Sequence, residues 1–293
     1  MYVVAGATGR VGSATARCLL EAGADVRVLV RRSADADGWE TRGAQARVAA
    51  LGDRVALGDA LEGCPGFFVL LPFDLTVDDL DSHADTLIAS IAGAVADRRV
   101  PHVVLLSSGG ADLAEGTGPI TGLHRLERAL LATGARVTAL RSGHFQEKVG
   151  DVLGIARDAG VFPVFAASAD SPHSMVATQD LGAIAAEALL APAADSEAVD
   201  IIGPAYSERD VATALGSALG RELHVVAIPE NGWVEALTGA GFSEYCATSL
   251  AELYRADEAG LLAPRGDRRI HVATDLGATL AGMLAPTERR SVR

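Results

Sequence analysis

Lysine is almost absent from this chain. Among 25 basic side chains only Lys148 is a lysine, so arginine carries nearly all of the positive charge. Acidic residues outnumber basic ones, since 38 Asp and Glu give a formal net charge of −13. Such a chain repels the phosphates of nucleic acids and anionic membranes. We therefore expect neither a nucleic acid nor a membrane as a partner.

Cysteine is scarce, and long apolar runs are missing. Three cysteines, Cys18, Cys64 and Cys246, are too few and too widely spaced for a disulfide framework or a metal motif. The seven histidines show no HExxH-type spacing, so we predict no metal site. No uninterrupted apolar stretch reaches the length of a membrane span. These features lead us to expect a cytoplasmic protein with reduced thiols.

Apolar residues make up 49% of the chain, and in its first half they gather in short β-branched runs separated by helical patterns. This alternation is typical of buried parallel strands in βαβ units. Right-handed crossovers then build an open, doubly wound sheet. The pattern predicts an α/β protein with a Rossmann fold, whose strands are expected at 2–5, 25–30, 46–49, 66–71, 102–106 and 136–140.

The regularity weakens after residue 142. We predict a dinucleotide-binding core over 1–142 and a smaller α/β lobe over 143–293, folded across the strand ends. Whether later segments such as 174–202 add strands to the core stays open. Within this half we expect strands at 174–177, 198–202 and 223–227, and helices at 179–190, 208–219, 231–237 and 243–258.

A glycine loop, Gly6–Gly12, lies directly between the first strand and the first helix. Glycines there allow a tight turn, close approach of the backbone to a pyrophosphate, and close packing of helix on sheet. The N–H groups and the dipole of a helix N-terminus favour the same anion. This context predicts a dinucleotide site, and a purely structural glycine turn is the alternative.

The end of the second strand carries Arg31 and Arg32 where an NAD-binding chain would have a carboxylate for the ribose. Arginine can grip a ribose 2′-phosphate instead. Arg10 in the glycine loop offers a further cation. We therefore predict NADP(H) in preference to NAD(H), the alternative being that these arginines are solvated charges.

Six segments are each too common to indicate a family alone, but their order along the chain is informative. They are the glycine loop, Leu29–Arg32, Phe68–Pro72, Val103–Gly109, Leu140–Glu147 and Met175–Gly182. In this order the chain resembles the NmrA-like group of atypical short-chain dehydrogenases, which includes type-2 NAD(P)H:quinone oxidoreductases. The resemblance implies cofactor contacts from Gly6, Thr8, Gly9, Arg10, Val11, Gly12, Arg31, Arg32, Leu71, Pro72, Phe73, Ser107 and Ser108. It also implies that Phe73, His144, Phe145 and Lys148 face the substrate.

The chain departs from the group at two places. Ala49–Leu51 replaces a Gly-Asp-Leu pattern, so Ala50 stands where the group has an acid near the adenine, and Asp53 corresponds to a second acid. Lys148 follows Glu147 where the group has asparagine, which places the single lysine near the expected pocket.

The Tyr–Lys pair of ordinary short-chain dehydrogenases is absent. That lysine lowers the pKa of a tyrosine four residues before it, so that the tyrosine can move a proton. Here the only lysine is Lys148, and no tyrosine precedes it at that spacing. The proton donor stays open among His124, His144, Ser107, Lys148 and water.

Hydride transfer to a quinone needs mainly proximity and stacking over nicotinamide. We therefore predict an NADPH-dependent reductase of a quinone, enone or similar electron-poor molecule, with aromatic residues such as Phe145 and Trp233 contacting a planar substrate. One alternative is a non-catalytic NADP(H) sensor that acts through a protein partner. Another is a specialised-metabolism reductase for one polycyclic intermediate. A homodimer stays open.

Overall fold

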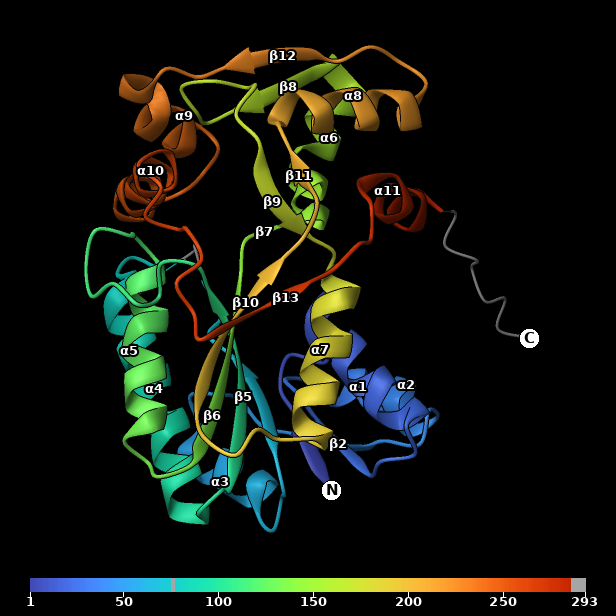
Figure 1. Ribbon diagram of the computed structural model, residues 1–293, viewed down its shortest axis with the longest axis vertical. Coiled ribbons are helices and arrows are strands. Elements are labelled where there is room, and N and C mark those ends of the chain that lie inside the picture. Colours follow the sequence, from blue (N-terminus) through green and yellow to red (C-terminus); the bar gives the residue numbers. More distant parts are fainter. Residues whose placement is uncertain (75–76, 286–293) are drawn as a thin grey trace.

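An eight-stranded parallel sheet forms the centre of the computed structural model, which describes residues 1–74 and 77–285. The strand order is β13-β10-β6-β5-β4-β1-β2-β3 (Figure 1). This arrangement confirms the predicted Rossmann fold. The strands are β1 (Tyr2–Val4), β2 (Val26–Val30), β3 (Gln45–Val48), β4 (Phe67–Leu70), β5 (His102–Ser108), β6 (Arg136–Ser142), β10 (Glu197–Ile202) and β13 (Arg268–His271).

The strand order reverses between β1 and β4. From β1 the chain adds β2 and then β3 toward one edge, and it then crosses to place β4 on the other side of β1. In doubly wound sheets, ligands bind in the crevice beside the carboxyl ends of the strands at such a point. The glycine loop follows β1 and therefore lies at this position.

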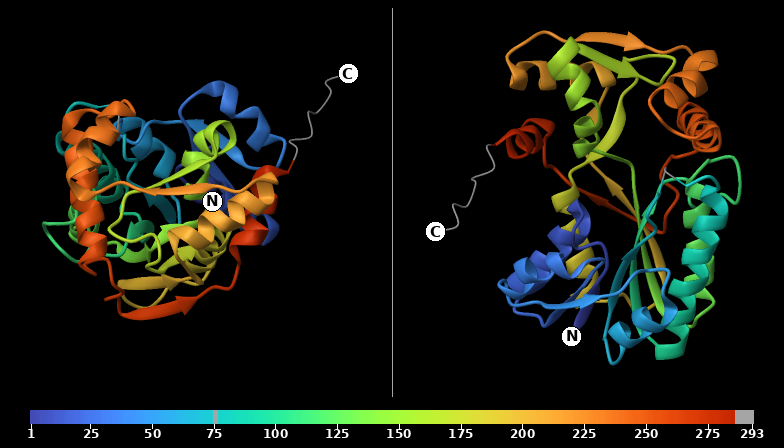
Figure 2. Two further views of the ribbon diagram at one scale, coloured as in Figure 1. Left: turned by 90° about the horizontal axis from the view of Figure 1, so that it is seen from above. Right: turned by 180° about the vertical axis from the view of Figure 1, so that it is seen from behind.

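Helices cover both faces of the sheet. One face carries α3 (Arg54–Leu61), α4 (Leu80–Arg98) and α5 (Ile120–Leu131), and the other carries α1 (Arg10–Glu21), α2 (Asp37–Glu40) and α7 (Thr178–Leu190). Figure 2 shows this division from behind, with the blue helices on one side of the sheet and the teal and green ones on the other. Side chains that neighbour each other in a strand therefore enter different cores, as Val3 and Val4, Phe67 and Phe68, and Val103 and Val104 do.

A lobe with its own apolar core lies across the carboxyl ends of the strands, at the top of Figure 1. It contains one sheet in the order β11-β9-β7 and another that pairs β12 with β8. No helix in the described ranges is both long and apolar enough to cross a membrane. The lobe elements are β7 (His144–Phe145), α6 (Leu153–Ala159), β8 (Val161–Val164), β9 (His173–Val176), β11 (Ala205–Tyr206), α8 (Glu208–Leu219), β12 (His224–Ala227), α9 (Trp233–Gly239), α10 (Glu244–Glu258) and α11 (Leu276–Leu284), with short 3₁₀ turns η2 (Gln146–Val152) and η3 (Glu230–Gly232); a further one, η1 (Ser33–Asp35), follows β2 in the core.

The second half of the chain also contributes to the large sheet. Strand β10 lies within the segment 174–202, for which this role was left open, and it pairs with β6. Strand β13 then pairs with β10 and forms the edge of the sheet. The division at residue 142 therefore describes only where the chain first enters the lobe, and it stays a prediction as a domain boundary.

Candidate active site

The backbone of the glycine loop needs glycine at two positions. Gly6 has φ +66°, a left-handed conformation that other residues adopt at a cost. A Cβ on Gly12 would lie only 2.4 Å from the carbonyl oxygen of Gly6. The first turn of α1 thus packs directly under the loop, as the predicted dinucleotide site requires.

The N-terminus of α1 is open toward this loop. The first N–H groups of a helix have no partner within the helix, and here no side chain caps them and no acidic residue lies in the first turn. By contrast Asp53, the residue expected to match a family acid, accepts hydrogen bonds from Val55 and Ala56 and so caps α3. The free N–H groups and the close backbone approach at Gly6 and Gly12 fit a pyrophosphate group.

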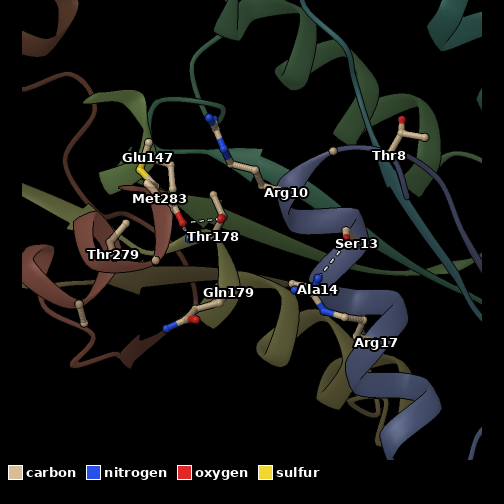
Figure 3. A pocket seen from close by; sticks show the side chains of 13 residues that line it. Thr8, Arg10, Ser13, Ala14, Arg17, Glu147, Thr178, Gln179, Thr279 and Met283 are labelled. Carbon is tan, nitrogen blue, oxygen red and sulfur yellow. Dashed lines mark hydrogen bonds between the residues drawn. The ribbon is translucent and has the colours of Figure 1, made fainter. Parts of the chain in front are cut away.

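A polar cleft of about 730 Å³ runs along α1 (Figure 3). Thr8, Arg10 and Arg17 contribute from the loop and α1, and Arg17 donates a hydrogen bond to Ser13 (3.2 Å). On the far side the buried Glu147 accepts hydrogen bonds from the N–H (2.9 and 3.1 Å) and hydroxyl (2.5 Å) of Thr178 at the start of α7. Glu147 is therefore a link between lobe and core.

Arg31 and Arg32 lie exposed at the end of β2, as predicted, but they differ in their partners. Arg32 forms a bidentate ion pair with Asp35, at 3.0 and 2.9 Å. Hydrogen bonding to Arg32 holds the pKa of Asp35 below its usual value. Arg31 makes no hydrogen bond or ion pair with the residues that the structure describes. Of these two arginines, Arg31 is therefore the one whose guanidinium remains available to an anionic ligand.

A second cavity, of about 530 Å³, lies where β5, β6 and β10 end, between the sheet and the lobe. We call it the carboxyl-end cavity. Its lining includes most of the predicted substrate-side residues, together with His173 on β9 and Tyr254 and Asp257 on α10. The predicted residues that line it are Phe73, Ser108, His144, Phe145 and Lys148.

The segment after β4 divides between core and cavity. Leu71, expected along the cofactor path, is buried (4% exposed), and its side chain packs against Gly122 of α5. The core therefore holds this side chain, and the contact of Leu71 with the cofactor stays a prediction. Pro72 and Phe73 are exposed, and Phe73 lines the carboxyl-end cavity. Phe73 follows β4, beside the place where the strand order reverses.

The hydroxyl of Ser107 has a partner on α5. Its hydroxyl is buried and donates a 2.6 Å hydrogen bond to Glu127, which also receives two hydrogen bonds from Arg141 (3.1 and 2.6 Å). The side chain of Ser107 is therefore directed at Glu127 on α5, and its catalytic and cofactor-contacting roles stay predictions. Only the neighbouring Ser108 lines the cavity.

His124 and Trp233 also lie elsewhere than expected. His124 on α5 bonds through Nδ1 to the carbonyl of Ala111 (2.9 Å) and is not among the cavity-lining residues. Trp233 is completely buried, donates to the carbonyl of Ile228 (2.8 Å), and packs edge-on against Tyr254. Tyr254 lines the carboxyl-end cavity and Trp233 does not, so the substrate contact of Trp233 stays a prediction.

Two histidines share one carboxylate in the cavity wall, which sequence reasoning missed. Nε2 of His144 lies 2.8 Å from Oδ2 of Asp257, and Nδ1 of His173 lies 3.5 Å from the same oxygen. Burial raises the pKa of the Asp257 carboxyl, but bonding to the two histidines outweighs it and holds that pKa well below its usual range. The bond to Asp257 raises the pKa of His173. Of the three, only His144 stood out in the sequence.

Lys148 lies at the cavity rim, as expected. Its Nζ is 5.8 Å from the centre of the Tyr254 ring, a cation–π distance. The pKa of the Tyr254 phenol is raised by burial. The lysine is exposed and so contributes a solvated positive charge at the mouth rather than a buried catalytic amine.

The family model described as "NmrA-like family" matches residues 2–261. The chain belongs to the NmrA-like family. An NAD(P)H azoreductase from Xenophilus azovorans is 29% identical to this NmrA-like chain over 255 residues, covering 87% of this chain and 86% of the azoreductase.

Solved structures share the fold of this NmrA-like chain. Triphenylmethane reductase from Citrobacter sp., complexed with NADP(H), superposes with a TM-score of 0.80 at 20% identity, covering 97% of this chain and 100% of the reductase. An NADPH-dependent quinone oxidoreductase from Escherichia coli gives a TM-score of 0.72 at 20% identity, with 97% and 99% covered. At this identity the likeness is one of fold.

Proposed function

We propose that this chain is an NADPH-dependent reductase that transfers hydride to a planar, electron-poor small molecule such as a quinone. One observation carries the proposal. At the carboxyl edge of a single parallel sheet, a free arginine at β2, an open helix N-terminus at β1 and a partly apolar cavity beyond β5 follow one another in the order of the strands. An extended dinucleotide has the same order of parts: adenosine, pyrophosphate, nicotinamide.

The cofactor end is the basis for preferring NADPH. Arg31 is free and exposed at the strand end where the adenosine ribose is expected, and no carboxylate replaces it there. A guanidinium matches the geometry of a phosphate and cannot lose its charge near neutral pH. Arg32 would contribute only after it releases Asp35.

The substrate end suits a flat conjugated molecule. Phe73, Phe145 and Tyr254 supply aromatic surface to a cavity whose floor is the end of the sheet. NADPH, when bound, supplies hydride, and the protein residues place the acceptor beside it and exclude water. The named relatives act on azo compounds, quinones and triphenylmethane dyes, all of them conjugated acceptors, which supports this substrate class.

The test follows NADPH absorbance anaerobically with stoichiometric protein while quinones, azo compounds and enones are added, and NADPH fluorescence reports binding in the same cuvette. We expect binding of NADPH and fast oxidation by at least one class of acceptor. Tight binding without oxidation by any acceptor would contradict the proposal and favour a cofactor sensor that acts through a protein partner.

A further inference from the structure

Asp257 occupies the position of an orienting group for two imidazoles. It projects from α10, while His144 and His173 come from adjacent strands, β7 and β9, whose parallel register pairs His144 with Met175. The two rings are 5.3 Å apart between centroids and meet edge to face. Three rigid elements therefore hold the donor atoms in place at the cavity wall.

One nitrogen of His144 is held by Asp257, and the other is free. Nε2 bonds to the carboxylate. Nδ1 has no hydrogen-bond partner within the described ranges, and it is not fully buried. Since His144 lines the carboxyl-end cavity and Nε2 is taken by Asp257, Nδ1 is the nitrogen left for a ligand in the cavity. A carboxylate that holds one imidazole nitrogen fixes the tautomer and stabilises the imidazolium, as in the Ser-His-Asp triad.

We propose that His144 is the catalytic acid that protonates the reduced acceptor, and that Asp257 and His173 are its positioning residues. This inference rests on the proposed reductase function and resolves what the missing Tyr–Lys pair leaves open. Ser107 and His124 are held by other partners, and Lys148 is solvated at the rim. His144 is the imidazole in the cavity wall with a short bond to a carboxylate.

The reaction balances with groups named here. Hydride from NADPH adds two electrons and one hydrogen nucleus to a carbon or nitrogen of the acceptor, and NADPH becomes NADP⁺. The π electrons move to the conjugated oxygen or nitrogen, which takes the Nδ1 proton of imidazolium His144. Solvent returns a proton to His144 after the product leaves.

The charge around His144 comes from several elements. Asp257 on α10 bonds to Nε2 of His144, and the more distant Glu208 on α8 raises the pKa of His173. Lys148 on η2 lowers the pKa of His173. Other charged residues of the cavity wall are Arg141, paired with Glu127, and Asp200, which accepts a hydrogen bond from Gly266; Asp151 acts on Tyr254.

Two acceptors separate proton donation from hydride transfer. A neutral quinone such as menadione needs a proton, whereas a cationic triarylmethane dye such as malachite green becomes neutral on taking hydride and needs none. For His144→Gln we expect kcat with the quinone to fall about 100-fold, as for loss of a general acid, and kcat with the dye to stay within about 3-fold. His224→Gln, at an exposed histidine outside the cavity, is the matched control and should leave both rates within about 2-fold.

Asp257→Asn supplies a readout that a structural role would not move. Asp257→Asn removes the carboxylate that holds Nε2 of His144, so the falling limb of the quinone pH–rate profile should change and the dye profile should not. The quinone rate of the wild type should also show a solvent deuterium effect. NADPH fluorescence checks that each variant is folded.

Each other outcome is decisive. The assignment of His144 is overturned, while the reductase function stands, if His144→Gln lowers the rates with both acceptors equally or lowers neither. The same holds if the wild-type quinone rate shows neither a falling limb in its pH profile nor a solvent isotope effect. If the wild type binds NADPH and reduces neither these acceptors nor any of the wider panel, the reductase function and this inference fail together.

Discussion

Gly182 on α7 lies directly against Ala14 on α1. A Cβ on Gly182 would be 2.3 Å from the Cβ of Ala14 and 2.8 Å from the backbone nitrogen of Thr15. The two helices therefore touch through their backbones over the first turns of each. Since α1 begins at the glycine loop and α7 begins at the residue bound by Glu147, this contact fixes the glycine loop relative to the lobe.

Gly182→Ala should destabilise the protein. The added methyl has no room without moving one helix, and overpacking of this kind costs about 1–3 kcal/mol. The midpoint of urea unfolding measures the change. Gly154→Ala is the control, because a Cβ at that position of α6 meets nothing within 4 Å, and it should leave stability unchanged or slightly higher. Equal effects of the two substitutions would contradict the close contact.

Gly9→Asp should weaken NADPH binding strongly. Gly9 is the N-cap of α1 in an extended conformation that asparagine or aspartate can adopt, so the helix itself should form. A carboxylate there would repel the pyrophosphate, and we expect Kd to rise about 100-fold relative to Gly9→Asn. NADPH fluorescence titration measures both. Equal affinities would mean that no anion binds at this helix end.

Arg31→Ala should weaken NADPH binding about 10-fold and NADH binding less than about 2-fold, since one charge-assisted contact to the 2′-phosphate is lost. Asp35→Ala should instead strengthen NADPH binding more than NADH binding, because it releases Arg32 to bind the same phosphate. Arg128→Ala, an exposed arginine on α5, controls for the change in net charge. Parallel losses for both cofactors in Arg31→Ala would contradict a 2′-phosphate role.

Ser107→Ala should lower stability and spare activity. The hydroxyl satisfies a buried Glu127, so its loss should cost about 1–2 kcal/mol in urea unfolding. The rate of quinone reduction should stay within about 3-fold, because Ser107 does not reach the cavity. A loss of two orders of magnitude in kcat with unchanged stability would restore Ser107 as a catalytic residue.

His173→Gln should destabilise the protein more at acidic than at alkaline pH. The pKa of His173 is raised in the folded state, so its contribution is complete below the unfolded pKa, near 6.5, and disappears as pH rises through the folded pKa. The difference in Tm between wild type and variant should therefore be larger around pH 5.5 than around pH 9. His224→Gln, an exposed histidine, should show no such trend. A pH-independent difference would mean that Asp257 does not stabilise charged His173.

Much of the core of the fold could be predicted from the sequence, because β4 (Phe67–Leu70) and the centre of β5 (Val103–Leu106) are continuous apolar runs. Strand β13, Arg268–His271, could not, since its sequence is Arg-Arg-Ile-His and only Ile270 is partly buried. An edge strand pairs through its backbone on one side and needs no apolar pattern. Helix α11 was also missed, because it packs on the lobe rather than extending the regular alternation.

Site residues were predictable where the backbone sets the chemistry and not where the side-chain environment does. The role of the glycine loop follows from local steric demands at Gly6 and Gly12. The fate of Ser107 depends on Glu127, and that of His144 on Asp257, 113 residues away and indistinguishable in sequence from an ordinary acidic residue on a helix. Only the packing of α10 against β7 and β9 reveals that partnership.

The single lysine has a practical consequence. Lys148 is exposed at the mouth of the carboxyl-end cavity, beside the Tyr254 ring, and no other side chain of the protein carries a primary amine. An amine-reactive dye applied above neutral pH would thus attach at one side chain, apart from the chain terminus. A fluorophore at that point would report arrival of a ligand at the mouth directly, without any engineered attachment site.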